Sequence, residues 1–136
     1  LMSLSEWKSG STAAGSGNHG NYHNNPQWRL VLPSRSDVLI RLRVPETKYS
    51  KSRPPLGLSL YSRSDPLGAD DARGGAKSIL SANDGVYSYP PGGALIPKTA
   101  LDGGTYVIVA STFDPWVGPC ELIVHAANGA RLDRFS

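Results

Sequence analysis

The 136-residue chain has a single cysteine, Cys120, and no Asn-x-Ser/Thr sequon at any of its six asparagines. A lone cysteine cannot form an intramolecular disulfide, and without a sequon there is no signal for N-glycosylation. Both absences favour a reducing compartment, so we expect a cytoplasmic location. The longest unbroken apolar run, Tyr106 to Ala110, is far shorter than the about 20 residues of a membrane-spanning helix.

Helix signals are nearly absent too, because Gly or Pro interrupts every window in which apolar residues recur at spacings of three and four. The motifs of several enzyme classes are also missing: there is no Gly-x-Ser-x-Gly elbow, no His-Glu-x-x-His pair and no Walker loop. These absences argue against serine hydrolases with a nucleophile elbow, zinc peptidases and nucleoside triphosphatases.

What the chain has in abundance is turn-forming residues, with 15 glycines, 11 prolines and 17 serines. Such a composition alone is typical of disorder. Against disorder stand 30 Leu, Ile, Val and Phe residues and a net charge of only +3. We therefore expect one loop-rich globular domain over residues 1–136. Leu1 precedes Met2, which indicates a segment of a longer protein.

Strand signals are frequent. In residues 38–44 apolar side chains alternate with positions that include two arginines, the period expected when one sheet face packs on a core and the other meets water. Residues 105–110 form a continuous β-rich run, typical of a strand buried on both faces. The predicted strands are Gln27 to Leu32, Val38 to Val44, Leu56 to Leu60, Thr105 to Ala110 and Cys120 to Ala127.

Turn signals separate these runs and divide the chain into seven or eight short strands without helical crossovers. The clearest are Asn25-Pro26, Asp65-Pro66, Asn83-Asp84-Gly85, Pro90-Pro91-Gly92-Gly93, Asp114-Pro115 and Asn128-Gly129. This pattern predicts an all-β fold, an antiparallel β-sandwich of about eight strands, with a small barrel as the alternative. Residues 1–25, rich in Ser, Gly and Asn, are expected to form an irregular leading segment, either a linker or an ordered edge.

Three constellations have the residues of a chemical site but not its context. Gly15 to Gly20 matches Gly-x-Gly-x-x-Gly, yet no helix follows to hold a phosphate. His19 and His23 have the spacing of two metal ligands on a helix, but their surroundings predict a loop and two further ligands are not evident. Cys120 and His125 would lie on opposite faces of one strand, about 16 Å apart, so they cannot form a catalytic dyad. We therefore expect no catalytic residue, no metal and no cofactor.

Charge is distributed unevenly, since residues 29–77 contain ten of the 14 basic residues but five of the 11 acidic ones. Arg41 and Arg43 fall on the polar face of one predicted strand, and Arg29 is expected to join them from an adjacent strand. A basic face of this kind could meet a partner protein, another domain of the same chain or anionic lipid, or could simply be solvated. Nucleic acid is not expected, because aromatic residues do not alternate with the cations. The candidate partner- or lipid-binding residues are Arg29, Arg41, Arg43, Lys48, Lys51 and Arg53.

Two stretches at opposite ends of the chain resemble one family. Residues 6–15, Glu-Trp-Lys-Ser-Gly-Ser-Thr-Ala-Ala-Gly, followed by Asn-Pro-Gln-Trp at 25–28, are similar to the opening of the calpain-type β-sandwich domain, calpain domain III. Residues 104–115 and 118–124 resemble its closing hairpin, and residues 56–61 resemble a central strand. The chain departs from the family pattern at Ala14, where a second Gly is usual, and at Cys120, where Phe is usual.

This resemblance implies a non-catalytic accessory domain of a calpain-like cysteine protease, making interdomain, substrate or partner-protein contacts. The catalytic Cys, His and Asn of calpains belong to other domains, so no peptidase activity is implied for this chain. Calcium binding is not carried over, because residues 48–53 are basic where conventional calpains have acidic residues, and six to eight oxygen ligands are not evident. The alternative function is a peripheral module that binds anionic phospholipid.

The basic loop makes the chain resemble the calpain-like proteases of the fungal PalB type. That likeness implies ambient-pH signalling, and it implies the protease core of the same chain or the endosomal sorting machinery as partners.

Overall fold

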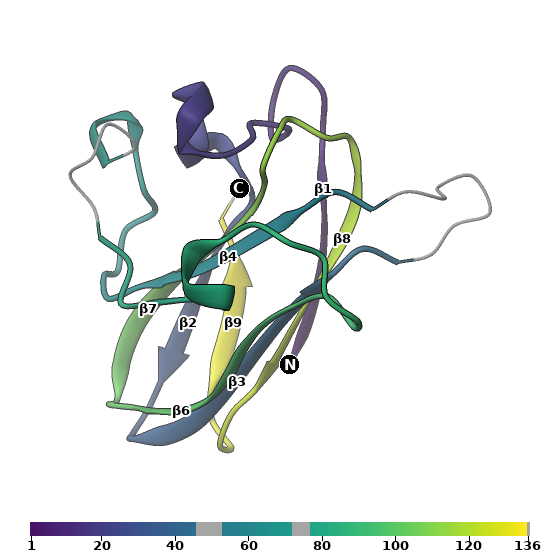
Figure 1. Ribbon diagram of the computed structural model, residues 1–136. Coiled ribbons are helices and arrows are strands. Elements are labelled where there is room, and N and C mark those ends of the chain that lie inside the picture. The colour runs from purple at the N-terminus through teal and green to yellow at the C-terminus, as the bar shows by residue number, and fades with distance from the viewer. Residues whose placement is uncertain (46–52, 72–76, 136) are drawn as a thin grey trace.

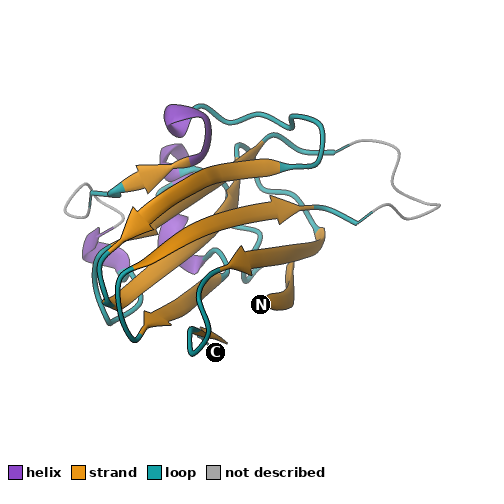
Figure 2. Ribbon diagram, turned by 90° about the horizontal axis from the view of Figure 1, so that it is seen from below, coloured by secondary structure: helices purple, strands orange, loops and turns teal. Residues whose placement is uncertain are grey.

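Two antiparallel sheets packed face to face make up the structure, a computed structural model that describes residues 1–45, 53–71 and 77–135 (Figures 1 and 2). The described residues contain nine strands and three short 3₁₀ helices, η1 (Gly17–His19), η2 (Tyr22–Asn24) and η4 (Ala82–Gly85). No helix among these residues is long and apolar enough to span a bilayer. The prediction of an all-β antiparallel sandwich is confirmed, and nine strands replace the expected eight.

One sheet has four strands. In spatial order they are β1 (Met2–Trp7), β8 (Gly118–His125), β3 (Ser36–Arg43) and β6 (Ala94–Leu101). The first strand of the chain thus pairs with the eighth, and Met2 lies opposite Ile123. Strands β3 and β8 are interior strands. Buried and accessible residues alternate strictly along β3, whereas in β8 the three consecutive residues Cys120, Glu121 and Leu122 are all buried.

The other sheet has five strands. In spatial order they are β5 (Leu80–Ser81), β4 (Leu56–Tyr61), β7 (Gly104–Thr112), β2 (Gln27–Leu32) and β9 (Arg131–Arg134). The central strand β7 is buried on both faces over 106–112, as its continuous apolar run predicts.

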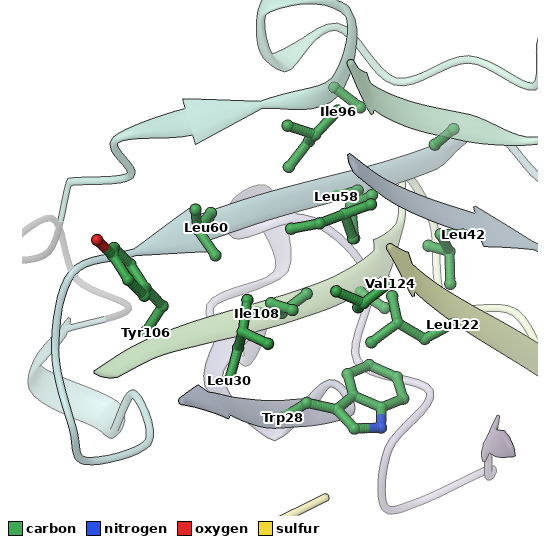
Figure 3. Packing of buried hydrophobic residues seen from close by; sticks show 14 of the residues in the cluster. Trp28, Leu30, Leu42, Leu58, Leu60, Ile96, Tyr106, Ile108, Leu122 and Val124 are labelled. Atoms are coloured by element: carbon green, nitrogen blue, oxygen red, sulfur yellow. The ribbon is translucent and has the colours of Figure 1, made fainter. Parts of the chain in front are cut away.

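The core lies between the sheets and combines the inward residues of both (Figure 3). Trp28, Leu30 and Ile108 come from the five-stranded sheet, and Leu42 and Leu122 come from the four-stranded sheet. The indole of Trp28 is fully buried, and its Nε1 donates to Ser3 Oγ at 2.9 Å, so its polar atom keeps a partner.

Of the two alternatives for the leading segment, a linker or an ordered edge, Met2–Trp7 follows the second because it forms β1, the edge strand of the four-stranded sheet. In β1 the serines face the core and two apolar residues face outward, the reverse of the pattern in the other long strands. Ser3 and Ser5 are half-buried, whereas Met2 and Leu4 are exposed on the outer face. The description of residues 1–25 as irregular is therefore wrong for this strand, and the physical reason is that serines face inward, where Ser3 Oγ accepts the Trp28 indole hydrogen bond.

A second layer covers the outer face of the five-stranded sheet. Val107 and Val109, both 0% exposed, pack with Tyr61 and with Leu67 from the loop after β4. Tyr22 of η2 and Phe135 pack against the same cluster.

The buried amide of Gln27 fixes this layer. Its Nε2 donates to the carbonyls of His23 (2.7 Å) and Leu67 (3.1 Å), and its Oε1 accepts from the Leu67 amide at 2.8 Å. Gln27 therefore holds two covering segments in place, one at His23 and the other at Leu67. These two residues are 44 positions apart in the chain.

Candidate contact surface

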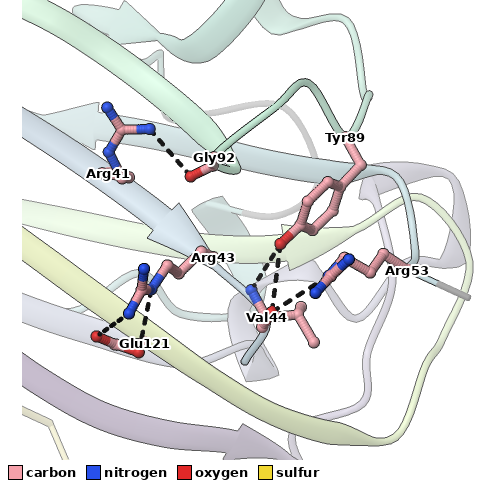
Figure 4. Close-up of polar contacts among 7 residues, drawn as sticks. All are labelled: Arg41, Arg43, Val44, Arg53, Tyr89, Gly92 and Glu121. Carbon is pink, nitrogen blue, oxygen red and sulfur yellow. Dashed lines mark hydrogen bonds and ion pairs between the residues drawn. The ribbon is translucent and has the colours of Figure 1, made fainter. Parts of the chain in front are cut away.

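Arg41 and Arg43 project from β3 on the outer face of the four-stranded sheet, as predicted, where each forms a defined contact (Figure 4). Arg41 Nη1 donates to the Gly92 carbonyl at 3.0 Å. Arg43 makes a two-pronged pair with Glu121 of β8, from Nε to Oε2 and from Nη2 to Oε1, both at 3.2 Å. The Glu121 side chain is only 11% exposed because Leu4 and Arg43 flank it on the neighbouring strands.

Arg53 is fixed by Val44 and Tyr89 beyond the end of β3 (Figure 4). Its Nε donates to the Val44 carbonyl at 3.3 Å, and its guanidinium carbon lies 5.3 Å from the centroid of the Tyr89 ring. The Tyr89 hydroxyl accepts from the Val44 amide at 3.1 Å and donates to the Val44 carbonyl at 3.3 Å. These bonds satisfy the backbone of Val44 where the ladder of β3 ends.

Arg43, Arg53 and Tyr89 line an open groove of about 650 Å³, which we call the arginine groove. Its lining is Arg43, Val44, Pro45, Arg53, Tyr89, Pro90, Pro91 and Gly92. The wall at Pro90 to Gly93 depends on its last residue: Gly93 has φ of +94°, and a Cβ there would overlap the carbonyl oxygen of Leu42. The turn is thus pressed directly against β3.

The predicted basic face is not a single surface. Arg29 lies on β2 in the other sheet, where its Nε and Nη2 donate to the Ser64 carbonyl at 3.2 and 3.1 Å and its guanidinium stacks on Phe135. The expectation that Arg29 joins Arg41 and Arg43 is therefore wrong, because β2 and β3 belong to different sheets. Lys48 and Lys51 lie outside the described residues.

Cys120 and His125 lie on opposite faces of β8, so they do not form a dyad. Cys120 is 1% exposed in the core, whereas His125 is exposed on the outer face. Burial raises the pKa of the Cys120 thiol to about 12, so the thiol is protonated and a poor nucleophile at neutral pH.

The two spaced histidines also fail to form a site. His19 Nε2 lies 3.1 Å from Asp114 Oδ1, and His23 instead supplies a carbonyl to the Gln27 amide. Within the described parts of the chain, no three His, Cys, Asp or Glu side chains come together in a metal-binding group. The glycine motif at 15–20 contains only the three-residue helix η1, too short to bind phosphate at its N-terminus.

Sequence reasoning missed Tyr89, Glu121 and Gly92 as parts of the arginine groove and its surroundings. Tyr89 contacts Val44 across 45 residues of sequence, and Glu121 pairs with Arg43 across 78. The Tyr-Pro-Pro-Gly-Gly run at 89–93 signalled a turn, but no local pattern indicates which strand that turn meets.

The fold defines the class of this protein as an antiparallel β-sandwich with a four-stranded and a five-stranded sheet. Comparison with known proteins then gives the family. The family model for the calpain large subunit, domain III, matches residues 4–117, so the chain belongs to the calpain domain III family. Domain III is a non-catalytic domain of calpain-like proteases.

Individual relatives agree with this assignment. The calpain-like protease palB/RIM13 of Aspergillus oryzae is 34% identical over 105 residues, which are 77% of this chain and 11% of that protein. The palB/RIM13 protease of Cryptococcus neoformans is 30% identical over 103 residues, covering 76% and 11%. Calpain-C of Drosophila melanogaster is 27% identical over 123 residues, covering 84% and 16%. The resemblance to PalB-type proteases is confirmed, and the chain spans about a tenth of the length of these fungal relatives.

Proposed function

We propose that this chain is an accessory domain of a longer calpain-like cysteine protease and that it makes protein contacts through the arginine groove. The partner is the protease core of the same polypeptide or a separate protein. One observation supports this proposal above the others: the two groove arginines are held in place before any partner arrives, Arg43 by Glu121 and Arg53 by Tyr89 and Val44.

This arrangement suits protein recognition for two reasons. Arginine and tyrosine are enriched where proteins bind one another, and fixed side chains lose less conformational entropy on binding. An ion-paired arginine such as Arg43 still has N–H groups that can donate to carbonyl or carboxylate oxygens of a partner. The prolines at 45, 90 and 91 add rigid apolar walls.

The alternative, binding of anionic phospholipid, gains less support from the same geometry. Binding to anionic headgroups depends on cations collected on one surface. Here Arg43 is paired with a carboxylate and Arg29 lies on the other sheet. We therefore place phospholipid binding second.

A variant series in the full-length protease tests the groove. Tyr89→Ala removes both the ring that stacks on Arg53 and the hydroxyl that bonds Val44, whereas Tyr89→Phe keeps the ring. We expect Tyr89→Ala to lower kcat/KM on a protein substrate about tenfold, Tyr89→Phe to have a smaller effect, and the exposed Arg131→Ala control to have none. Unchanged kcat/KM and unchanged domain association in Tyr89→Ala, with the domain still folded, would show that the groove makes no functional contact.

Sedimentation with vesicles tests the alternative. The isolated domain is mixed at physiological salt with vesicles of phosphatidylcholine alone or with about a third of phosphatidylserine. We expect phosphatidylserine not to increase the amount of the domain that pellets with the vesicles. Pelleting that Arg41→Ala and Arg43→Ala abolish would instead favour the lipid function.

A further inference from the structure

The outer face of the four-stranded sheet carries apolar side chains on all four of its strands. We call them the apolar strip: Met2 and Leu4 on β1, Ile123 on β8, Leu39 on β3 and Leu95 on β6. The register brings them together, because Met2 lies opposite Ile123, Ile123 opposite Arg41, and Arg41 opposite Leu95. A row of side chains thus crosses the whole sheet with Arg41 near its centre.

Two residues of the strip, Met2 and Leu4, are among the large apolar side chains of the described chain that are exposed. Met2 is 63% exposed and Leu4 is 67% exposed, and the other three strip residues are half-buried. Apolar residues gathered on one surface and bordered by polar groups, as here by Arg41, mark sites where other molecules bind. No described segment covers the strip, in contrast to the outer face of the other sheet.

The charges around the strip largely neutralise one another. Three ion pairs link neighbouring groups, Glu6 with Lys8 at 3.4 Å, Arg43 with Glu121 at 3.2 Å and Asp37 with Lys98 at 3.5 Å. Arg41 remains with a single described hydrogen bond, to the Gly92 carbonyl, although a guanidinium has five N–H donors.

This charge pattern identifies the kind of surface that fits the strip. A membrane surface is held by an excess of cations beside the apolar residues, and paired charges supply no such excess. A protein surface that is apolar and carries one carboxylate opposite Arg41 satisfies both features of the strip. The strip crosses the face of four paired strands, which suits a folded partner, since an extended peptide binds best in a groove or at a strand edge.

We propose that the apolar strip is the docking face for another folded domain of the same polypeptide, which presents an apolar surface and a carboxylate to Arg41. The fungal relatives are about nine times as long as the segment that matches this chain, so most of such a polypeptide lies outside this domain. Domains of one chain commonly meet over surfaces of this mixed apolar and polar character. The inference rests on the proposal that this chain is part of a longer protease, but not on the arginine groove, which begins at the last residue of β3.

Hydroxyl-radical footprinting with mass spectrometry tests this inference by comparing the isolated domain with the full-length protein. We expect oxidation of Met2 and Leu4 to be at least about fivefold slower in the full-length protein. Ile79, 47% exposed beside β5 in the other sheet, is the internal reference and should react equally in both. Equal oxidation of Met2 and Leu4 in the two proteins would overturn the proposal.

Two variants sharpen the test. Leu4→Asp places a charge in the strip at an exposed position, so the domain stays folded, and it should restore fast oxidation of Met2 in the full-length protein. Ile79→Asp is the matched control and should leave Met2 protected. Protection that appears in the isolated domain at high concentration, with dimer formation by light scattering, would assign the strip to a second copy. Protection that needs added phosphatidylserine vesicles would assign it to a membrane. Either result would overturn the proposed occupant.

Discussion

Both outer faces of the sandwich carry apolar side chains, but other parts of the described chain cover only one of the two faces. On the five-stranded sheet, Val107 and Val109 lie under Tyr22, Leu67 and Phe135. On the four-stranded sheet, the apolar strip remains accessible within the described chain. Apolar residues on an outer strand face therefore do not by themselves indicate a binding surface. The difference is whether the chain supplies its own cover.

Polar side chains decide which face is covered. Gln27 bonds to two loop segments at once, so the cover of the five-stranded sheet is fixed by three hydrogen bonds as well as by apolar contact. The polar groups of the other face bond mainly within the sheet, as Arg43 does with Glu121. That leaves its apolar residues for an external partner.

The largest expected effect separates the two faces directly. Val109→Asp buries an unpaired charge under the covering layer and should lower the free energy of unfolding by about 4 kcal/mol or more. Leu4→Asp, at a 67% exposed position, should change it by less than about 1 kcal/mol. Urea unfolding followed by tryptophan fluorescence measures both. Similar losses in the two variants would mean that the faces do not differ in burial.

The next effect concerns the amide that fixes the cover. Gln27→Ala removes three hydrogen bonds and leaves the buried Leu67 amide without an acceptor, so stability should fall by about 2–3 kcal/mol. Hydrogen exchange should show faster exchange at Leu67 than at residues of β3. If Leu67 kept its protection in this variant, the apolar contacts alone would hold the cover.

On the open face, the expected effects are smaller. Arg43→Ala strips the partner from a carboxylate that is only 11% exposed and should cost about 1–2 kcal/mol. Adding Glu121→Gln should recover part of this loss, because the amide carries no charge. The exposed pair of Lys98 and Asp37 is the control, and Lys98→Ala should cost less than about 0.5 kcal/mol. A double-mutant cycle without coupling between Arg43 and Glu121 would contradict the observed pairing.

The smallest effect is a response of the cover to acid. Two hydrogen bonds lower the pKa of Asp71 below its usual value. The one from Arg63 has the larger effect, and the one from the Gly68 amide has the smaller. A lowered pKa stabilises the fold above the unfolded-state value of about 4 and loses that contribution as pH falls through the folded-state value. Acidification below about pH 4 should therefore raise hydrogen exchange around residues 63–71 more than in Asp71→Asn. Identical pH responses in the two proteins would rule this out.

The sequence was sufficient to predict the strands whose alternation follows the core. Gln27–Leu32, Ser36–Arg43 and Gly104–Thr112 each have a continuous inward set of apolar residues, and each was predicted within two residues of its bounds. The ordered edge at β1 is one of two alternatives open from the sequence, and its alternation does not indicate a strand because its serines face inward. Strand β6 was missed because Pro97 interrupts its pattern, and β5 and β9 are too short to show one.

The candidate surface was harder to predict than the strands. Alternation tells which residues share a face of one strand, so Arg41 and Arg43 were placed together correctly. Alternation does not tell which sheet the next strand joins, and for that reason Arg29 was placed wrongly. The partners of the arginines lie in distant parts of the chain, where only the folded topology brings them close.

The pairing of early strands with late ones also bears on how the domain folds during synthesis. Strand β1 pairs with β8 and β2 pairs with β7 and β9, and the backbone nitrogen of Leu1 donates to the carbonyl of Val124. Ribosomes add about 5–20 residues per second, so β2 waits several seconds for its partners. During that interval Trp28 and Leu30 lack their sheet neighbours, and such non-local pairing also slows folding. A nascent chain in this state exposes apolar side chains and unpaired strand edges, the features that make partly folded chains prone to aggregate.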